Sequence, residues 1–128
     1  MRQITYAKGD IIFRQGDPAA VMYDIISGEV GIFSGYQTEQ EEKVAELAAG
    51  QIFGEMGMIG NEPRSATAVT LEDDTTLETI YPEDLEDLFR KNPPKVEMIL
   101  RHMSFRLRRL TVDYLAACRK LAGETAGK

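Results

Sequence analysis

A change of pattern near Pro82 constrains the fold of this chain more than any other feature of the sequence. Before this proline, short apolar runs alternate with glycines and polar turns, and no long segment has a helical period. After it, apolar residues recur at steps of three and four, as they do along a helix. The first part therefore predicts a β-sandwich or β-roll, and the second part predicts helices. We assign the α+β class, as a jelly-roll-like β-roll with flanking helices and a long C-terminal helix.

Several strands can be placed from the alternation of apolar and polar residues. Residues 21–25 alternate, Ser27 and Gly28 turn the chain, and residues 30–32 alternate again, which predicts a β-hairpin. The polar stretch 37–42 is expected to be an exposed loop. Further strands are expected at residues 44–47, 65–70 and 76–81.

Two helices are expected in the C-terminal part. Residues 82–84 suit a helix start, because proline is tolerated at the first helical position and acids favour the positive end of the dipole. Leu85, Leu88 and Phe89 would share one face of this first helix, directed toward the sheet. Residues 92–94 contain two prolines, so the first helix is expected to end there and the second to begin.

The second helix, from about residue 94 to 121, has the longest periodic pattern in the chain. Its apolar seam has the spacing of a coiled coil, which favours a homodimer formed through this helix. A long helix that packs only on its own domain is the alternative. The seam consists of Val96, Leu100, Met103, Leu107, Leu110, Tyr114, Ala117 and Leu121.

Composition limits the classes of function that need to be considered. The 128 residues, 43% of them hydrophobic, suit one globular domain. A net charge of −6 argues against general attraction to nucleic acid. One cysteine and one histidine cannot form an internal disulfide or a multi-histidine metal site. No apolar run is long enough to span a membrane, so we expect a cytoplasmic protein.

Residues 53–67 carry the main functional signal. The glycines around the helix start expected there would present unpaired backbone N–H groups, which attract a phosphate. Arg64 adds a planar, permanently charged fork for two phosphate oxygens, whereas the carboxylate of Glu55 is an acceptor suited to a ribose hydroxyl. A ligand that joins phosphate to ribose would use all of these groups. Taken singly, Arg64 and Glu55 are also compatible with ordinary surface charges, and the glycines with tight turns.

The joint pattern resembles the phosphate-binding cassette of the cyclic nucleotide-binding domain family. The match lies in Phe53-Gly54-Glu55 and, nine residues after the glutamate, in Arg64 within residues 63–67. The resemblance covers roughly residues 4–121. Upstream it includes Gly9, Phe13, Gly16, Asp17, Tyr23, Ile25, Gly28 and Val30.

The resemblance implies a ligand and a set of binding residues. The ligand would be cyclic AMP or cyclic GMP, with Glu55 on the ribose 2′-hydroxyl and Arg64 on the exocyclic phosphate oxygens. Arg106 would face the nucleotide or Glu55, and Leu110 and Thr111 would help to cover the base. No further cofactor is implied. The candidate site residues are Phe53, Gly54, Glu55, Met56, Gly57, Pro63, Arg64, Ser65, Ala66, Arg106, Leu110 and Thr111.

The resemblance also bears on domain organisation and partners. We expect one binding domain over residues 1–122, with the β-roll at about 4–81, the helices at about 82–121, and a short tail at 123–128. Family members usually carry an output domain such as a DNA-binding helix-turn-helix, a kinase or a channel. We expect none in this chain, so the output would come from an unknown protein effector, from self-association, or from a domain outside this sequence. No paired nucleophile and base is apparent, so we do not expect an enzyme.

Three alternatives stay open. A degenerate family member could keep the fold as an oligomerisation or interaction module without ligand, although Glu55 and Arg64 argue against this. A metal-dependent enzyme of the cupin type normally needs several histidines. A redox or haem sensor of the related bacterial regulators needs cysteines or other ligands that this chain mostly lacks. The choice between cyclic AMP and cyclic GMP depends on groups near the base and is not decided by the sequence.

Overall fold

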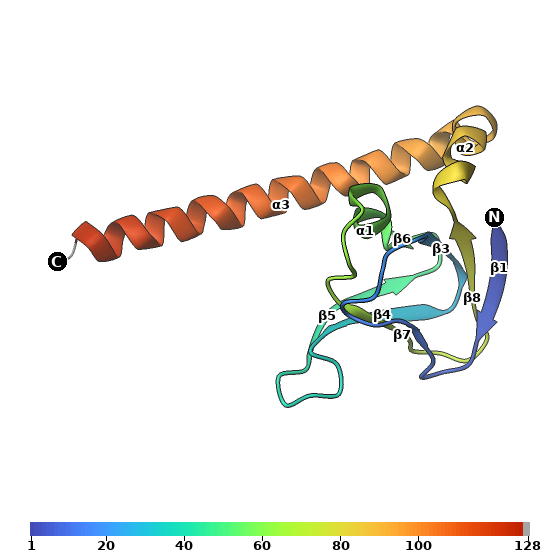
Figure 1. The fold of residues 1–128 in the computed structure, drawn as a ribbon, viewed down its shortest axis with the longest axis horizontal. Coiled ribbons are helices and arrows are strands. Elements are labelled where there is room, and N and C mark those ends of the chain that lie inside the picture. Colours follow the sequence, from blue (N-terminus) through green and yellow to red (C-terminus); the bar gives the residue numbers. More distant parts are fainter. Residues whose placement is uncertain (127–128) are drawn as a thin grey trace. The chain divides into compact units, whose positions relative to one another are not determined.

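Eight strands form two four-stranded antiparallel sheets in the computed structural model, which describes residues 1–126 (Figure 1). The strand orders are β1-β8-β3-β6 and β2-β7-β4-β5. Because strands far apart in the sequence are neighbours in both sheets, the predicted β-roll is confirmed. The strands are β1 (Arg2–Tyr6), β2 (Ile11–Phe13), β3 (Met22–Ser27), β4 (Glu29–Ser34), β5 (Glu42–Ala48), β6 (Ile52–Phe53), β7 (Thr67–Thr70) and β8 (Thr75–Ile80).

One apolar core joins the two sheets into a sandwich. The first sheet contributes Ile25 of β3 and Leu77 of β8, and the second contributes Val30 of β4 and Ala68 of β7. All four side chains are essentially inaccessible to solvent. Successive side chains of a strand point to opposite faces of its sheet, so these four residues mark the face of each sheet that lies inward.

The chain does not form the predicted hairpin at Gly28. β3 pairs with β8 and β6, whereas β4 pairs with β5 and β7, so the chain passes from one sheet to the other at this turn. Gly28 has a φ of +89°, and a Cβ there would lie 2.2 Å from Oγ1 of Thr75. A tight glycine turn thus connects the two layers, which local alternation alone cannot distinguish from a hairpin.

The remaining strands lie close to the positions that the sequence predicts for them. β5 covers the predicted segment 44–47 and is longer by a few residues, and β8 covers 75–80. The polar loop lies between β4 and β5, and its residues 38–41 are exposed. β7 begins at Thr67, two residues later than predicted, because residues 64–66 belong to the segment that connects α1 to the sheet.

Two short helices complete the part of the chain that contains the sheets. α1 (Glu55–Gly60) lies between β6 and β7. The helix start predicted at residues 82–84 is a single 3₁₀ turn, η1 (Pro82–Asp84), and α2 (Leu85–Lys91) follows it. Leu88 is buried, but Phe89 is 61% exposed, so the prediction that both face the sheet is wrong for Phe89.

The chain divides into two compact units, residues 1–91 and the part from Asn92 onward. The second unit is α3 (Pro93–Ala126), which begins one residue before the predicted helix and runs five residues beyond its predicted end. None of the helices within residues 1–126 combines the length and the hydropathy that a membrane-spanning segment needs.

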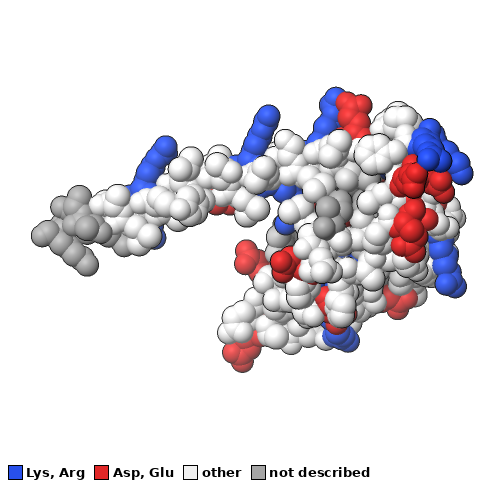
Figure 2. All heavy atoms as spheres, turned by 45° about the horizontal axis from the view of Figure 1, so that its top comes forward, with Lys and Arg blue, Asp and Glu red and all other residues white. Residues whose placement is uncertain are grey.

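Large apolar side chains are exposed along α3. Figure 2 shows widely spaced lysine and arginine side chains on this helix with uncharged surface between them. Glu97 and Arg101 form an ion pair at 2.5 Å, one turn apart. The exposed apolar residues of the helix are Leu100, Phe105, Leu107, Leu110, Val112, Tyr114, Leu115 and Leu121.

Candidate functional site

The predicted cassette is built around the start of α1. β6 runs into this helix through Gly54, whose φ of +80° lies in the left-handed region that favours glycine. A Cβ on Gly54 would lie 2.7 Å from Nη1 of Arg64. The helix is six residues long, and the first N–H groups of any helix lack intrahelical partners. A glycine is therefore required here both by the backbone conformation and by the approach of the arginine.

Glu55 is the first residue of α1 and is only 2% exposed. An acidic side chain in the first turn interacts favourably with the positive end of the helix dipole. Its burial excludes the alternative in which Glu55 is an ordinary solvated surface acid, because glutamate is seldom buried without a specific role.

Arg64 is buried as well, with 6% of its surface exposed. Its guanidinium donates from Nη1 to the carbonyl oxygen of Gly54 at 2.8 Å and from Nη2 to the carbonyl oxygen of Val21 at 2.5 Å. These carbonyls belong to the turn before α1 and to the segment that enters β3. Arg64 thus connects two parts of the first unit, and the alternative of an ordinary surface arginine is excluded.

The backbone of Arg64 is held by the loop between β2 and β3. Its N–H donates to the carbonyl oxygen of Asp17, and its carbonyl accepts from the N–H of Gly16, both at 2.8 Å. The N–H of Arg14 in turn donates to Oδ2 of Asp17 at 2.9 Å. This loop therefore fixes the backbone from which the Arg64 side chain extends.

Aromatic rings line the other side of the guanidinium. Cζ of Arg64 lies 4.2 Å from the ring centroid of Phe13 and 5.9 Å from that of Tyr23. A cation is attracted to the face of an aromatic ring at such distances. Burial lowers the pKa of the Arg64 guanidinium from its ordinary value, while the nearby Tyr23, Asp17 and Glu55 act in the opposite direction.

The comparisons with known proteins agree with this geometry. The family model for the cyclic nucleotide-binding domain matches residues 3–92. Over 108 residues the chain is 35% identical to the cyclic AMP receptor protein of Thermus thermophilus. This alignment covers 84% of this chain and 50% of that relative. This chain belongs to the cyclic nucleotide-binding domain family.

Solved structures extend the comparison to the fold. The catabolite activator protein of Thermus thermophilus has a TM-score of 0.75 at 35% identity, covering 90% of this chain and 55% of that one. The cAMP-bound form of the EAL enzyme Bd1971 has a TM-score of 0.63 at 30% identity. The match covers 86% of this chain and 29% of that one. The chain thus spans only about half the length of the cyclic AMP receptor protein.

The remaining cassette residues differ in exposure. Phe53 is buried and stacks on Tyr23 with ring centroids 5.0 Å apart. Gly57 lies close to the β2–β3 loop, because a Cβ there would be 2.7 Å from Cβ of Ala19. Ala66 is half-buried, and Met56, Pro63 and Ser65 are exposed. The structure thus brings the predicted residues 53–57 and 63–66 of this family's cassette into the same unit.

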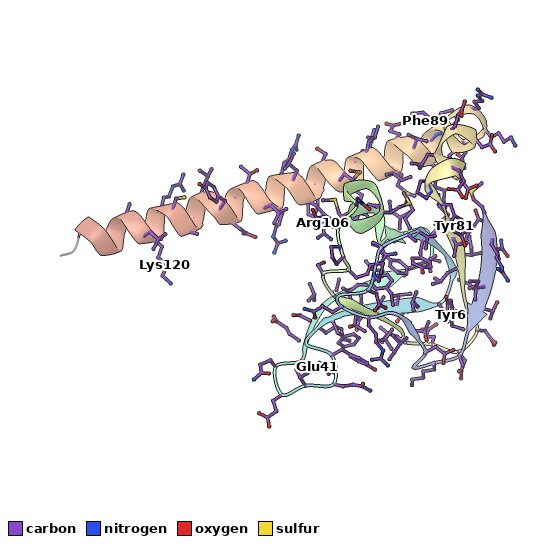
Figure 3. All side chains as sticks on the ribbon, in the orientation of Figure 1. Tyr6, Glu41, Tyr81, Phe89, Arg106 and Lys120 are labelled. Carbon is purple, nitrogen blue, oxygen red and sulfur yellow. The ribbon has the colours of Figure 1, made fainter. Side chains whose placement is uncertain are left out.

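The three residues predicted to approach the nucleotide from the C-terminal helix lie on α3, in the second unit. Arg106, labelled in Figure 3, is exposed, as are Leu110 and Thr111. The hydroxyl of Thr111 donates to the carbonyl oxygen of Leu107 at 2.9 Å, which is one turn earlier on the same helix. The role predicted for these residues toward the base remains a prediction.

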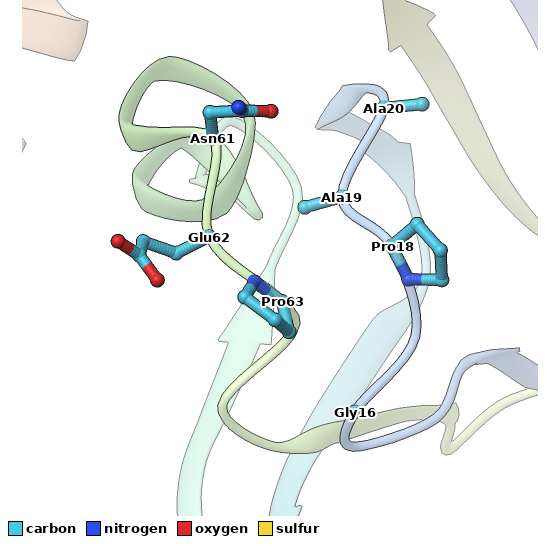
Figure 4. Close-up of a pocket in the computed structure, with 7 residues that line it drawn as sticks. All are labelled: Gly16, Pro18, Ala19, Ala20, Asn61, Glu62 and Pro63. Carbon is cyan, nitrogen blue, oxygen red and sulfur yellow. The ribbon is translucent and has the colours of Figure 1, made fainter.

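An open pocket of about 440 Å³ lies beside the cassette (Figure 4). Its walls are the β2–β3 loop and the turn after α1, and Figure 4 shows Pro18 and Pro63 facing each other across it while Glu62 points away. Within residues 1–126, no three His, Cys, Asp or Glu side chains could hold a metal ion. The pocket is lined by Gly16, Pro18, Ala19, Ala20, Asn61, Glu62 and Pro63.

Sequence reasoning assigned no role to three groups that hold Arg64. They are the ring of Phe13, the carbonyl oxygen of Val21 and the backbone of Asp17. Phe13 and Asp17 belong to the residues that carry the family resemblance. The resemblance therefore indicates that these residues are important, but it does not indicate their contact with Arg64. No sequence pattern marks the Val21 carbonyl, because any residue provides one.

Proposed function

We propose that this chain is a regulatory module that binds cyclic AMP or cyclic GMP and transmits binding through its C-terminal helices. The observation that carries the proposal is the burial of Glu55 and Arg64, two opposite charges at either end of one glycine-rich segment, within a cyclic nucleotide-binding domain. Charged residues are seldom buried unless they are paired or serve a ligand. A sensor of this kind needs no catalytic group.

Each part of the cassette matches one part of a cyclic nucleotide. Arg64 supplies charge-assisted hydrogen bonds to the cyclic phosphate, and the backbone N–H groups near Gly54, Glu55 and Met56, around the start of α1, supply further donors. The Glu55 carboxylate accepts from the ribose 2′-hydroxyl. Ser65 and Ala66 follow the arginine and flank the phosphate.

Binding of a phosphate would change the set of hydrogen bonds that Arg64 makes. A guanidinium has five N–H donors, and the carbonyls of Gly54 and Val21 each accept from one nitrogen of the fork. Nε of Arg64 is buried and has no hydrogen-bond partner within residues 1–126. The phosphate would therefore take the donors that remain, which keeps both carbonyl bonds, or replace one of the carbonyls, which breaks one of the links between Arg64 and its own chain.

Output is proposed to run through α3. Arg106, Leu110 and Thr111 would cover the base, so that the nucleotide favours one arrangement of the C-terminal helices. The exposed apolar residues of the helix would pair with those of a second copy in a homodimer. The resulting change would be passed to an unknown protein effector.

Calorimetric titration of the 128-residue chain with cyclic AMP and with cyclic GMP tests the binding proposal, with 5′-AMP as the non-cyclic control. We expect saturable binding of at least one cyclic nucleotide and much weaker binding of 5′-AMP. Glu55→Gln should weaken binding about tenfold, since a hydrogen bond to a charged group contributes about 1.5 kcal/mol or more. Glu62→Gln, an exposed carboxylate seven residues away, is the matched control and should bind like the parent.

A second candidate function is a family member that keeps the fold without a ligand and serves as an oligomerisation module. One specific observation favours it: the Arg64 fork is already bonded to two carbonyls of its own chain. This function predicts a stable dimer that binds neither nucleotide. Because both functions predict a dimer, the titrations with cyclic AMP and cyclic GMP distinguish them.

A further inference from the structure

Phe13 occupies a defined place next to the cassette arginine. It is the last residue of β2, and its backbone pairs with Ala68 of β7, four residues after Arg64. This pairing brings the Phe13 ring centroid to 4.2 Å from Cζ of Arg64. The ring thus covers one face of the guanidinium.

Two further rings hold Phe13 in this position. Its ring centroid is 6.0 Å from that of Tyr23 and 6.0 Å from that of Phe53, and those two rings stack at 5.0 Å. Aromatic pairs at these separations are favourable and restrict ring movement. The three rings come from β2, β3 and β6, so the orientation of the Phe13 ring is determined by the packing of the sandwich.

We infer that Phe13 is a positioning residue of the binding site, which holds the Arg64 guanidinium over its ring face while the carbonyls of Gly54 and Val21 hold the fork. The inference rests on the proposed role of Arg64 in binding the phosphate. With one face and two nitrogens fixed, the guanidinium has one orientation before any ligand arrives. A ligand then bears less of the cost of ordering this side chain.

The aromatic character of residue 13 is essential to this role. A buried cation loses hydration, and the electron-rich face of a phenyl ring compensates for part of that loss. Leucine at this position would fill a similar part of the core but would not attract the cation. Tyrosine would keep the ring face.

A double-mutant cycle in the ligand-free protein tests the contact itself. The unfolding equilibrium constants of the parent, Phe13→Leu, Arg64→Met and the double variant are measured by urea denaturation. Each substitution should raise the unfolding equilibrium constant by some factor. We expect the factor for the double variant to be about 5–30 times smaller than the product of the two single factors, which corresponds to the interaction of a desolvated cation with a ring. Multiplicative effects would overturn the inference. If Phe13→Leu does not fold, Phe13→Met takes its place.

The same variants test the consequence for ligand binding. Phe13→Leu should weaken binding of cyclic AMP or cyclic GMP about 5–30-fold, whereas Phe13→Tyr should bind like the parent. In a protein that already carries Arg64→Met, adding Phe13→Leu should cause no further loss of binding. The matched control is Phe33→Leu, because Phe33 is equally half-buried but packs on Tyr36 with centroids 5.1 Å apart. Equal losses in both backgrounds, or no rescue by tyrosine, would overturn the inference.

The two proposals fail in different ways. A parent protein that binds neither cyclic nucleotide contradicts the proposed function, while the ligand-free cycle still decides whether Phe13 holds Arg64. A parent protein that binds, together with uncoupled Phe13 and Arg64, contradicts the positioning role alone.

Discussion

Arg64 donates from Nη1 to the carbonyl oxygen of Gly54 at 2.8 Å, and thereby bonds to the N-cap residue of α1. The same guanidinium reaches Val21, just before β3, so one side chain connects the cassette to the first sheet. A ligand that binds Arg64 therefore acts on both ends of this link. The two charged residues of the cassette are part of the fold as well as candidates for binding.

Gly54→Ala should destabilise the protein and weaken nucleotide binding. The φ of +80° costs a residue with a Cβ about 1–2 kcal/mol, and the new methyl group would lie 2.7 Å from Nη1 of Arg64. We expect a loss of about 1–3 kcal/mol in the free energy of unfolding, measured by urea denaturation. Gly60→Ala is the control, because its Cβ has room and alanine favours a helix. Equal effects of the two variants would show that the contact with Arg64 is unimportant.

Gly28→Ala should be the more severe of two glycine substitutions at positive φ. Gly28 and Gly50 have almost the same φ, +89° and +90°, but only Gly28 faces an obstacle, at 2.2 Å in Thr75. Gly50→Ala should therefore cost about 1–2 kcal/mol of unfolding free energy, from backbone strain alone. Gly28→Ala should cost about 2–5 kcal/mol, because the turn between the sheets must also shift. Similar midpoints of urea unfolding for the two variants would contradict the tight crossing between the sheets.

Replacing both Leu107 and Leu110 with glutamate should convert a dimer into monomers. These side chains are 66% and 55% exposed, and charges in an apolar seam between two helices would be buried without partners. Sedimentation at tens of micromolar, with and without cyclic nucleotide, measures the effect. Val44→Glu, an equally exposed apolar residue on β5, should leave the dimer intact. A monomeric parent under both conditions would refute dimerisation through α3.

The sequence was sufficient to predict the architecture because strand and helix periods differ clearly on the two sides of Pro82. The long α3 was predicted to within a few residues, since its prolines mark one end and its apolar period continues for many turns. The turn at Gly28 was predicted wrongly. Alternation shows that two strands follow each other, but which sheet each strand joins depends on pairing with β7 and β8, far away in the sequence.

The candidate site was predicted in part for a similar reason. Local spacing identified Glu55 and Arg64 with their glycines, and both prove to be buried. The partners of Arg64 are separated from it by many residues, as in the cases of Phe13 and Val21. Contacts between distant segments follow from the packing of the sandwich, which no local pattern encodes. The exposure of Phe89 shows the same limit, since a helical period does not determine which apolar residues meet a neighbour.

Arg64 is proposed to bind the phosphate of a cyclic nucleotide, and calorimetric titration of Arg64→Ala beside the parent tests this role. Each charge-assisted bond contributes about 1.5–3 kcal/mol, so we expect binding about a hundredfold weaker or worse, and Arg64→Lys should recover little because it lacks the fork. Arg14→Ala, an exposed arginine in the β2–β3 loop, is the matched control and should bind like the parent.

Arg64→Ala also removes the bonds to Gly54 and Val21, so all proteins are compared at a temperature where unfolding measurements show each to be folded. We expect the parent and Arg14→Ala to bind cyclic AMP or cyclic GMP with the same affinity, and Arg64→Ala to bind far more weakly. A folded Arg64→Ala that binds as tightly as the parent, or a parent that binds neither nucleotide, would contradict the proposed role of Arg64.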